Sequence, residues 1–202
     1  MTLSRQELVV AYWPMYSEVI LMALLDRIDH TINIPEGVSA TLDDDMATLS
    51  GPNGSISREF ISGRVSLFRE GDALIVRVDI PRRKEKALAG AWAAHLRNMV
   101  VGVTDGFTYH LKALYSHFPM TLAVKGNIFV VNNYFGEKVP RNAALPWASE
   151  VKVEVKNKVE ITVSGADKEK VGQTAANIER CTTVKKRDRR VFQDGIYLVK
   201  KE

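Results

Sequence analysis

Polar and apolar residues alternate along many short stretches of the chain, as they do in half-buried β-strands. The alternation is clearest at 74–80, 107–113, 151–155 and 159–163, and a shorter version occurs at 38–42. Further short strand candidates are 46–50, 56–60, 65–68, 122–124, 128–130 and 196–199. Turn-forming Gly, Asn, Asp and Pro residues separate most of these stretches. The pattern therefore predicts antiparallel strands joined by tight hairpins, and it leaves 132–146 as an irregular segment.

Residues 83–100 instead repeat their apolar positions at helical spacing. One apolar residue in each turn is expected to face a sheet: Leu88, Trp92, Leu96 and Met99. We expect Gly102 to end this helix, because glycine tolerates the left-handed backbone that follows a helix end.

A second helix is predicted from Asp167, which would cap the first amides, to Arg180. Its buried stripe is Val171, Ala175 and Ile178. Gly172 lies inside this helix, where glycine costs about 1 kcal/mol relative to alanine. We take it to mark close approach of another backbone, either of this chain or of RNA.

The two halves of the chain resemble each other. The pattern at 38–42 matches that at 151–155, and ATLSG (47–51) matches ITVSG (161–165). Each hairpin precedes a helix with an Ala-Ala-x-aliphatic step, at 93–96 and 175–178. The repeat predicts an α+β fold of two tandem similar domains, each a small antiparallel sheet with one helix packed on one face. The domains would cover 22–104 and 105–202.

Residues 1–21 show no sustained period, and we expect a disordered N-terminal extension or a start-site artefact, with Met22 as the natural start. The longest apolar run, Val19–Leu25, has seven residues and is too short to span a membrane. A lone cysteine, Cys181, excludes an internal disulfide and a four-cysteine zinc site. It suits a reducing compartment.

Charge is concentrated in one short segment. Residues 180–193 contain six Lys or Arg and one Asp, a net charge of +5, whereas the whole chain has +4. The other 188 residues therefore sum to −1. Six like charges repel one another unless a polyanion neutralises them, and arginine binds phosphate through two parallel hydrogen bonds. The segment is either a phosphate-binding loop or a solvated basic loop without a partner.

Several segments also resemble one known family. IPEGV (34–38), SGPNGSISREF (50–60), HLRNMVVGVTDGF (95–107) and VSGADKEKVGQTAANIER (163–180) are similar, in the same order, to the universal large-subunit ribosomal proteins called "L six". CTTVKKRDRRVFQDGIYLV (181–199) resembles the archaeal and eukaryotic branch of that family. The resemblance covers nearly all of 30–199. It is weakest at 116–148 and does not extend to the first 21 residues.

This resemblance implies a structural protein of the large ribosomal subunit in the cytoplasm, with no cofactor, metal or small-molecule substrate. It implies binding of large-subunit rRNA mainly through the C-terminal domain, near the translation-factor-binding region and the sarcin–ricin loop. Neighbouring large-subunit proteins would be further partners, with translation factors nearby. The expected RNA contacts are Lys168, Lys170, Gly172, Gln173, Asn177, Arg180, Lys185, Lys186, Arg187, Arg189, Arg190 and Gln193. Cationic groups would neutralise phosphates, and amides would reach 2′-hydroxyls and base edges.

Two alternatives remain open. The chain could be a non-ribosomal RNA-binding module of the same build. It could also be an enzyme with Cys181 as nucleophile, since basic neighbours can lower a thiol pKa. Its base would be one of the four histidines, His30, His95, His110 or His117. No motif links these residues, and the sequence has neither a phosphate-binding glycine loop nor metal-ligand spacing.

Overall fold

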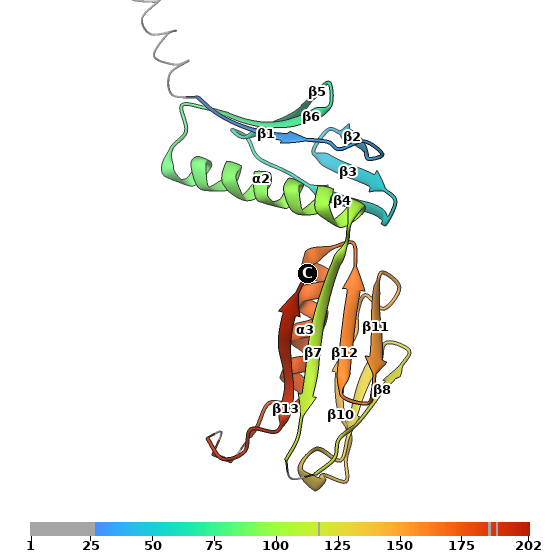
Figure 1. Cartoon of the computed structure of the whole chain (residues 1–202). Coiled ribbons are helices and arrows are strands. Elements are labelled where there is room, and N and C mark those ends of the chain that lie inside the picture. The colour runs from blue at the N-terminus through green and yellow to red at the C-terminus, as the bar shows by residue number, and fades with distance from the viewer. Residues whose placement is uncertain (1–26, 117, 186, 189) are drawn as a thin grey trace, which may run out of the picture. The chain divides into compact units, whose positions relative to one another are not determined.

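The computed structural model describes residues 27–202, apart from His117, Lys186 and Arg189 (Figure 1). The predicted extension 1–21 and the proposed start at Met22 lie outside the described residues. Contacts divide the chain into two compact units. One comprises the residues up to Thr48 together with Ser57–Arg97, and the other comprises Leu49–Ile56 together with Asn98–Glu202. The predicted boundary between residues 104 and 105 stays a prediction.

From Arg27 onward, the first half consists of six strands and one long helix. Its strands are β1 (Arg27–Asn33), β2 (Ser39–Asp43), β3 (Met46–Gly51), β4 (Gly54–Glu59), β5 (Ser66–Glu70) and β6 (Ala73–Asp79), followed by α2 (Arg83–Thr104). They form two three-stranded sheets, ordered β1-β6-β5 and β2-β3-β4. Phe60 packs edge-on against Trp92 of α2, with ring centroids 5.2 Å apart.

The second half repeats this order and adds one strand. It contains β7 (Phe107–Leu114), β8 (Thr121–Lys125), β9 (Ile128–Asn132), the 3-10 turn η1 (Tyr134–Gly136), β10 (Arg141–Ala144), β11 (Val151–Lys156), β12 (Glu160–Gly165), α3 (Lys168–Cys181) and β13 (Gly195–Lys201). Its sheets are ordered β11-β12-β7-β13 and β10-β9-β8. The α+β class is confirmed. Each half, however, holds two small sheets rather than the single sheet expected.

The sheet orders show that the fold is duplicated, but they correct the predicted register of the repeat. β2-β3-β4 corresponds to β8-β9-β10, and β1-β6-β5 corresponds to β7-β12-β11. The hairpin β2–β3 is therefore the counterpart of β8–β9, not of β11–β12 as its sequence suggested. Met46 and Ile128, which begin β3 and β9, are 82 residues apart. The sequence match failed because one alternating hairpin looks much like another.

Helix α2 begins at Arg83, as predicted, but ends later than predicted. It continues through Gly102 to Thr104, so Gly102 does not end it. A Cβ on Gly102 would lie 2.1 Å from the backbone oxygen of Ala166, so close approach explains this glycine. The helix is closed by Gly106, whose φ is +78° and whose N–H donates to Val101 O. Leu88 is exposed rather than buried, and Ala89 takes its place on the buried face.

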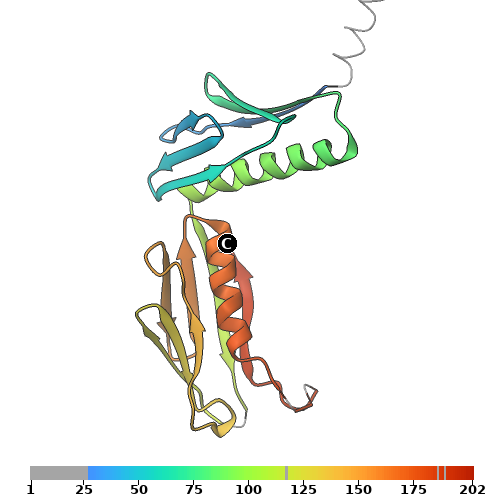
Figure 2. The same ribbon diagram turned by 180° about the vertical axis from the view of Figure 1, so that it is seen from behind.

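The core of the second half lies between α3 and its sheets (Figure 2). Along β7, the residues Phe107, Tyr109, Leu111 and Ala113 are buried, as predicted. From α3, Val171, Ala175 and Ile178 pack into the same cluster, also as predicted, and the Asp167 side chain accepts from Glu169 N at 2.8 Å. The helix is thereby held against the sheet, and its remaining side chains are left for other contacts.

The segment 132–146 is more ordered than predicted. It contains η1 and the strand β10, which pairs with β9. Within the described residues, no helix has the length and apolar character that crossing a membrane requires.

Candidate nucleic-acid interface

The basic loop, defined here as residues 182–194, joins the end of α3 to the start of β13. Its described basic side chains, Lys185, Arg187 and Arg190, are all exposed. Lys186 and Arg189 lie outside the described residues. Figure 1 shows the loop at the end of the second half where β7 finishes and β13 begins.

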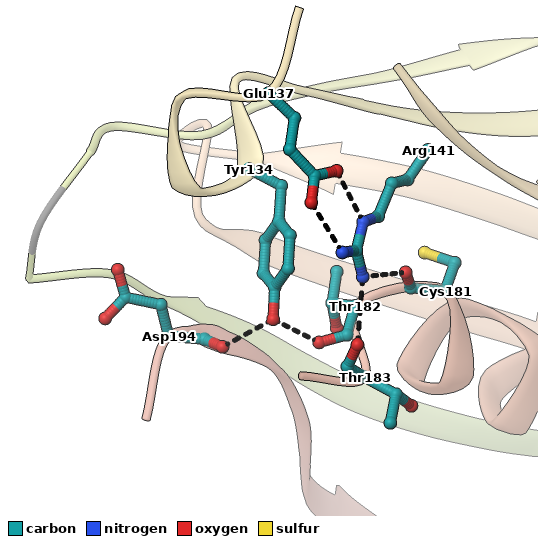
Figure 3. A network of polar contacts seen from close by, with 7 residues as sticks. All are labelled: Tyr134, Glu137, Arg141, Cys181, Thr182, Thr183 and Asp194. Carbon is teal, nitrogen blue, oxygen red and sulfur yellow. Dashed lines mark hydrogen bonds and ion pairs between the residues drawn. The ribbon is translucent and has the colours of Figure 1, made fainter. Parts of the chain in front are cut away.

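Tyr134, from η1, joins the two ends of this loop (Figure 3). Its hydroxyl lies 2.5 Å from Thr182 O and 3.0 Å from Asp194 O, and its side chain is buried. Burial raises the pKa of Tyr134 to about 12, so the phenol remains a protonated donor at neutral pH. A further bond, from Ile196 N to Thr182 Oγ1 at 2.9 Å, also joins the two ends. The base of the loop is therefore closed.

Arg141, from β10, holds the first part of the loop. Its Nη1 donates to Cys181 O at 3.2 Å and to Thr183 O at 2.9 Å. Its Nε and Nη2 donate to the two carboxylate oxygens of Glu137, at 2.8 and 2.7 Å. The same guanidinium lies over the ring of Tyr134, 4.2 Å from the centroid. Arg141 thus binds the backbone that leaves α3 and is itself fixed by a carboxylate and an aromatic ring.

The far side of the loop has its own internal bonds. Asp188 accepts from Arg190 N through its side chain at 2.9 Å, and its backbone oxygen accepts from Phe192 N at 2.9 Å. Gln193 Nε2 donates to Arg190 O at 3.2 Å. These bonds form a helix-like turn that fixes the backbone of Arg190. Less conformational entropy is therefore lost when the loop binds a partner.

Arg187 is the most constrained of the described basic side chains in the loop. Its Cζ lies 5.0 Å from the ring centroids of both Phe135 and Phe192. Those rings are themselves packed edge to face at 5.6 Å. A guanidinium that lies against two rings keeps its charge and its hydrogen-bond donors while its stem is held in position.

Three predicted site residues of α3 lie on the helix face that leads to the loop. Gln173, Asn177 and Arg180 are spaced at i, i+4 and i+7, which places them on one side. Gln173 Nε2 donates to Asn177 Oδ1 at 2.9 Å, and Asn177 Nδ2 donates to Ala144 O at 3.2 Å. The amides are therefore linked to each other and to β10, and Arg180 continues the face into the basic loop.

The two predicted lysines lie elsewhere. Lys168 and Lys170 are in the first turn of α3, about 15 to 18 Å along the helix from Arg180 at 1.5 Å per residue. Lys170 Nζ is 2.5 Å from Glu150 Oε2, and Lys168 Nζ donates to Asn98 Oδ1 at 3.2 Å. The structure therefore does not bring these lysines together with the basic loop, and Lys170 is already paired with a carboxylate.

Gly172 has space beside it. A Cβ at this position would meet only Tyr109, at 3.7 Å from a ring atom and 3.9 Å from the hydroxyl. These are ordinary contact distances, and among the described residues no backbone atom outside the helix lies within 4 Å. Of the two explanations predicted for this glycine, approach by another backbone of this chain is wrong. Approach by RNA stays a prediction.

The environment of Cys181 differs from the one that a nucleophile needs. Burial raises its pKa to about 11, and this effect outweighs the opposing charge of Arg141. Its thiol donates to Ile178 O at 3.0 Å. The thiol is therefore protonated at neutral pH, although basic residues are close in the sequence. Of the candidate bases, His117 lies outside the described residues. In the described part of the chain, no three His, Cys, Asp or Glu side chains are grouped to hold a metal.

The sequence pattern identified the charges of the loop but not the residues that hold it. Tyr134 and Arg141 belong to the segment predicted to be irregular, and their loop partners are 40 to 60 residues away in the chain. One sequence signal was present, since Tyr134 and Arg141 are a large aromatic residue and an arginine in a stretch without alternation. This signal does not identify the residues that they contact.

Comparison with known proteins agrees with the duplicated fold. A protein-family model described as Ribosomal protein L6 matches residues 34–106 and 118–195, one segment in each half. "Large ribosomal subunit protein uL6" of Methanobrevibacter smithii is 44% identical over 181 residues, which cover 90% of this chain and all of the relative. The proteins of that name from Methanosarcina mazei and Aeropyrum pernix are 45% and 44% identical, over 88% and 85% of this chain and 99% and 93% of their own lengths. The chain therefore belongs to the ribosomal protein L6 family.

Proposed function

We propose that this protein is a structural constituent of the large ribosomal subunit and binds large-subunit rRNA through its C-terminal half. The binding surface would be the basic loop together with the face of α3 formed by Gln173, Asn177 and Arg180. Neighbouring large-subunit proteins would be its other partners, in the cytoplasm and near the site where translation factors bind. Family membership supports the ribosomal role, since the relatives are named as large-subunit proteins.

The observation that carries the RNA-binding proposal is the anchored loop. Tyr134 and Arg141 fix its base, while Lys185, Arg187 and Arg190 remain exposed. A preorganised array of cations suits a backbone of fixed shape, because little conformational entropy is lost on binding. Folded RNA presents phosphates and 2′-hydroxyls in such a fixed arrangement, and we expect shape to matter more than sequence. Lys168 and Lys170 would contact RNA separately from the loop.

Binding to deproteinised large-subunit rRNA tests this proposal. Arg187→Ala with Arg190→Ala should weaken binding and reduce the slope of log affinity against log salt by roughly 1.5, because each lost phosphate contact changes the slope by about 0.7 to 0.9. The matched control is Lys152→Ala with Lys156→Ala. It removes the same charge from exposed positions on β11, at the opposite edge of the sheet from β13. Equal effects of the two double variants would remove the loop from the interface.

Sedimentation of cell extract tests the ribosomal role itself. In low-salt magnesium buffer the protein should travel with the large subunit and be released by high salt. If it stays at the top of the gradient while the purified protein still binds RNA, it acts as a non-ribosomal RNA-binding module.

A further inference from the structure

An open hollow of about 480 Å³ lies beside the basic loop. It is lined by Leu114, Tyr115, Ser116, Gln193, Asp194 and Tyr197. Its residues come from the end of β7, the end of the loop and the start of β13, so the hollow and the basic loop are continuous at Gln193. The volume is within the range of small-molecule sites, about 300 to 1,000 Å³.

The wall of the hollow includes two exposed tyrosine rings. Tyr115 is 44% exposed and Tyr197 is 41% exposed. The ring of Tyr197 lies over Gly195, where an added Cβ would be 3.4 Å from three of its atoms, and its hydroxyl donates to Gln193 O at 2.9 Å. Tyr197 is therefore held by Gly195 against one side of its ring and by the hydrogen bond of its hydroxyl, while part of the ring remains exposed to solvent. A fixed aromatic surface of this kind suits stacking by a planar group.

The polar groups of the hollow favour a neutral ring over a phosphate. Ser116 donates to Asp194 Oδ1 from its N–H at 3.2 Å and from its hydroxyl at 2.9 Å, which places a carboxylate in the wall. That carboxylate would repel a phosphate. Gln193 donates one amide hydrogen to Arg190 O, and an amide carries a second hydrogen and a carbonyl oxygen as well.

We propose that this hollow binds one unpaired nucleobase of the rRNA, stacked on Tyr197 or Tyr115, while adjoining phosphates contact Arg187 and Arg190. The inference rests on the proposed function and adds a base-binding subsite to it. A cationic loop next to an aromatic hollow with an acidic wall matches the two parts of a nucleotide chain, anionic backbone and neutral base. Stacking of single-stranded bases on aromatic side chains is tolerant of sequence.

The test uses the full chain and deproteinised large-subunit rRNA from an archaeal ribosome. Tyr115→Leu with Tyr197→Leu keeps apolar bulk but removes the aromatic faces. We expect this variant to raise Kd by about tenfold with an unchanged salt slope, since stacking releases no counterions. Tyr115→Phe with Tyr197→Phe keeps both rings and should retain wild-type affinity. Ultraviolet crosslinking of the unmodified protein should attach a nucleotide to a peptide containing Tyr115 or Tyr197.

The outcomes separate this inference from the proposed function. Wild-type affinity in the leucine variant, or crosslinks on other peptides alone, would overturn the base subsite even if the arginine variant still loses binding. Unchanged binding in both the leucine and the arginine variants would overturn the proposed function too. If the leucine variant binds rRNA normally but is not incorporated into large subunits, the hollow receives a neighbouring protein and the base subsite is wrong.

Discussion

Replacing Tyr134 by phenylalanine tests how the basic loop is anchored. The change removes only a hydroxyl, so the ring still fills its place in the core and leaves no cavity. It deprives two backbone oxygens, those of Thr182 and Asp194, of the donor that they share. Both residues are at least 96% buried. Leaving a buried acceptor unsatisfied costs about 1 to 3 kcal/mol, and we expect a loss of about 2 kcal/mol in unfolding free energy.

Amide hydrogen exchange is the most direct assay. Because the chain forms two units, global unfolding need not be two-state, whereas exchange reports on individual positions. The Ile196 N–H, which donates to Thr182 Oγ1, should lose protection in Tyr134→Phe by the same free energy. Affinity for rRNA should fall as well, although no cation has been removed, because binding must then order the loop.

The matched control for this experiment is Tyr109→Phe. Tyr109 is also a buried tyrosine of the same core, 7% exposed. Its hydroxyl makes no hydrogen bond with the described residues of the chain. The control should therefore leave both the exchange of Ile196 and the rRNA affinity near their wild-type values. Equal loss of protection in the two variants would refute the view that the Tyr134 hydroxyl closes the loop.

Three other predictions concern single side chains. Hydrogen bonding from Arg141 lowers the pKa of Glu137. The ionised pair therefore stabilises the fold above the ordinary carboxyl pKa of 4.5, and this stabilisation is lost as the pH falls through the lowered value. In urea titrations the wild type should lose more stability on acidification than Glu137→Gln. The raised pKa of Cys181, about 11, predicts that iodoacetamide modifies the native protein more slowly than the urea-unfolded chain, as followed by intact mass. Gly172→Ala should raise the unfolding free energy by up to about 1 kcal/mol through helix propensity but weaken rRNA binding. Unchanged affinity in that variant would remove Gly172 from the interface.

Much of the fold could be predicted from the sequence because its signals are local. The buried stripe of α3, its Asp167 cap and the alternation along β7 each depend on residues within one or two turns or pleats of one another. The charge of the basic loop is likewise a local property. These features were predicted at close to their observed positions, and the predicted start and end of α3 differ from the structure by one residue.

The features that failed depend on long-range pairing. The register of the repeat needed the sheet orders, since period-two alternation is common to every hairpin in the chain. Leu88 was misplaced because Leu88 and Ala89 both lie about one helical turn before Trp92, four and three residues away. The spacing alone therefore does not decide which of the two faces the sheet. Arg141 and Tyr134 carry no local mark of their role, because their partners on the loop are supplied by the fold.

The duplication also explains why the basic loop occurs in the second half. The sheet β1-β6-β5 ends at β1, whereas its counterpart β11-β12-β7 continues to β13, which pairs with β7 on the edge that corresponds to the outer edge of β1. Adding this strand requires a connection from the end of α3 to the far end of β7, and that connection is the basic loop. The two ends of the loop are held by α3 and β13, so a few contacts from η1 and β10 are enough to order it. The shared scaffold thus positions the helix and the sheet, and the added strand positions the cations.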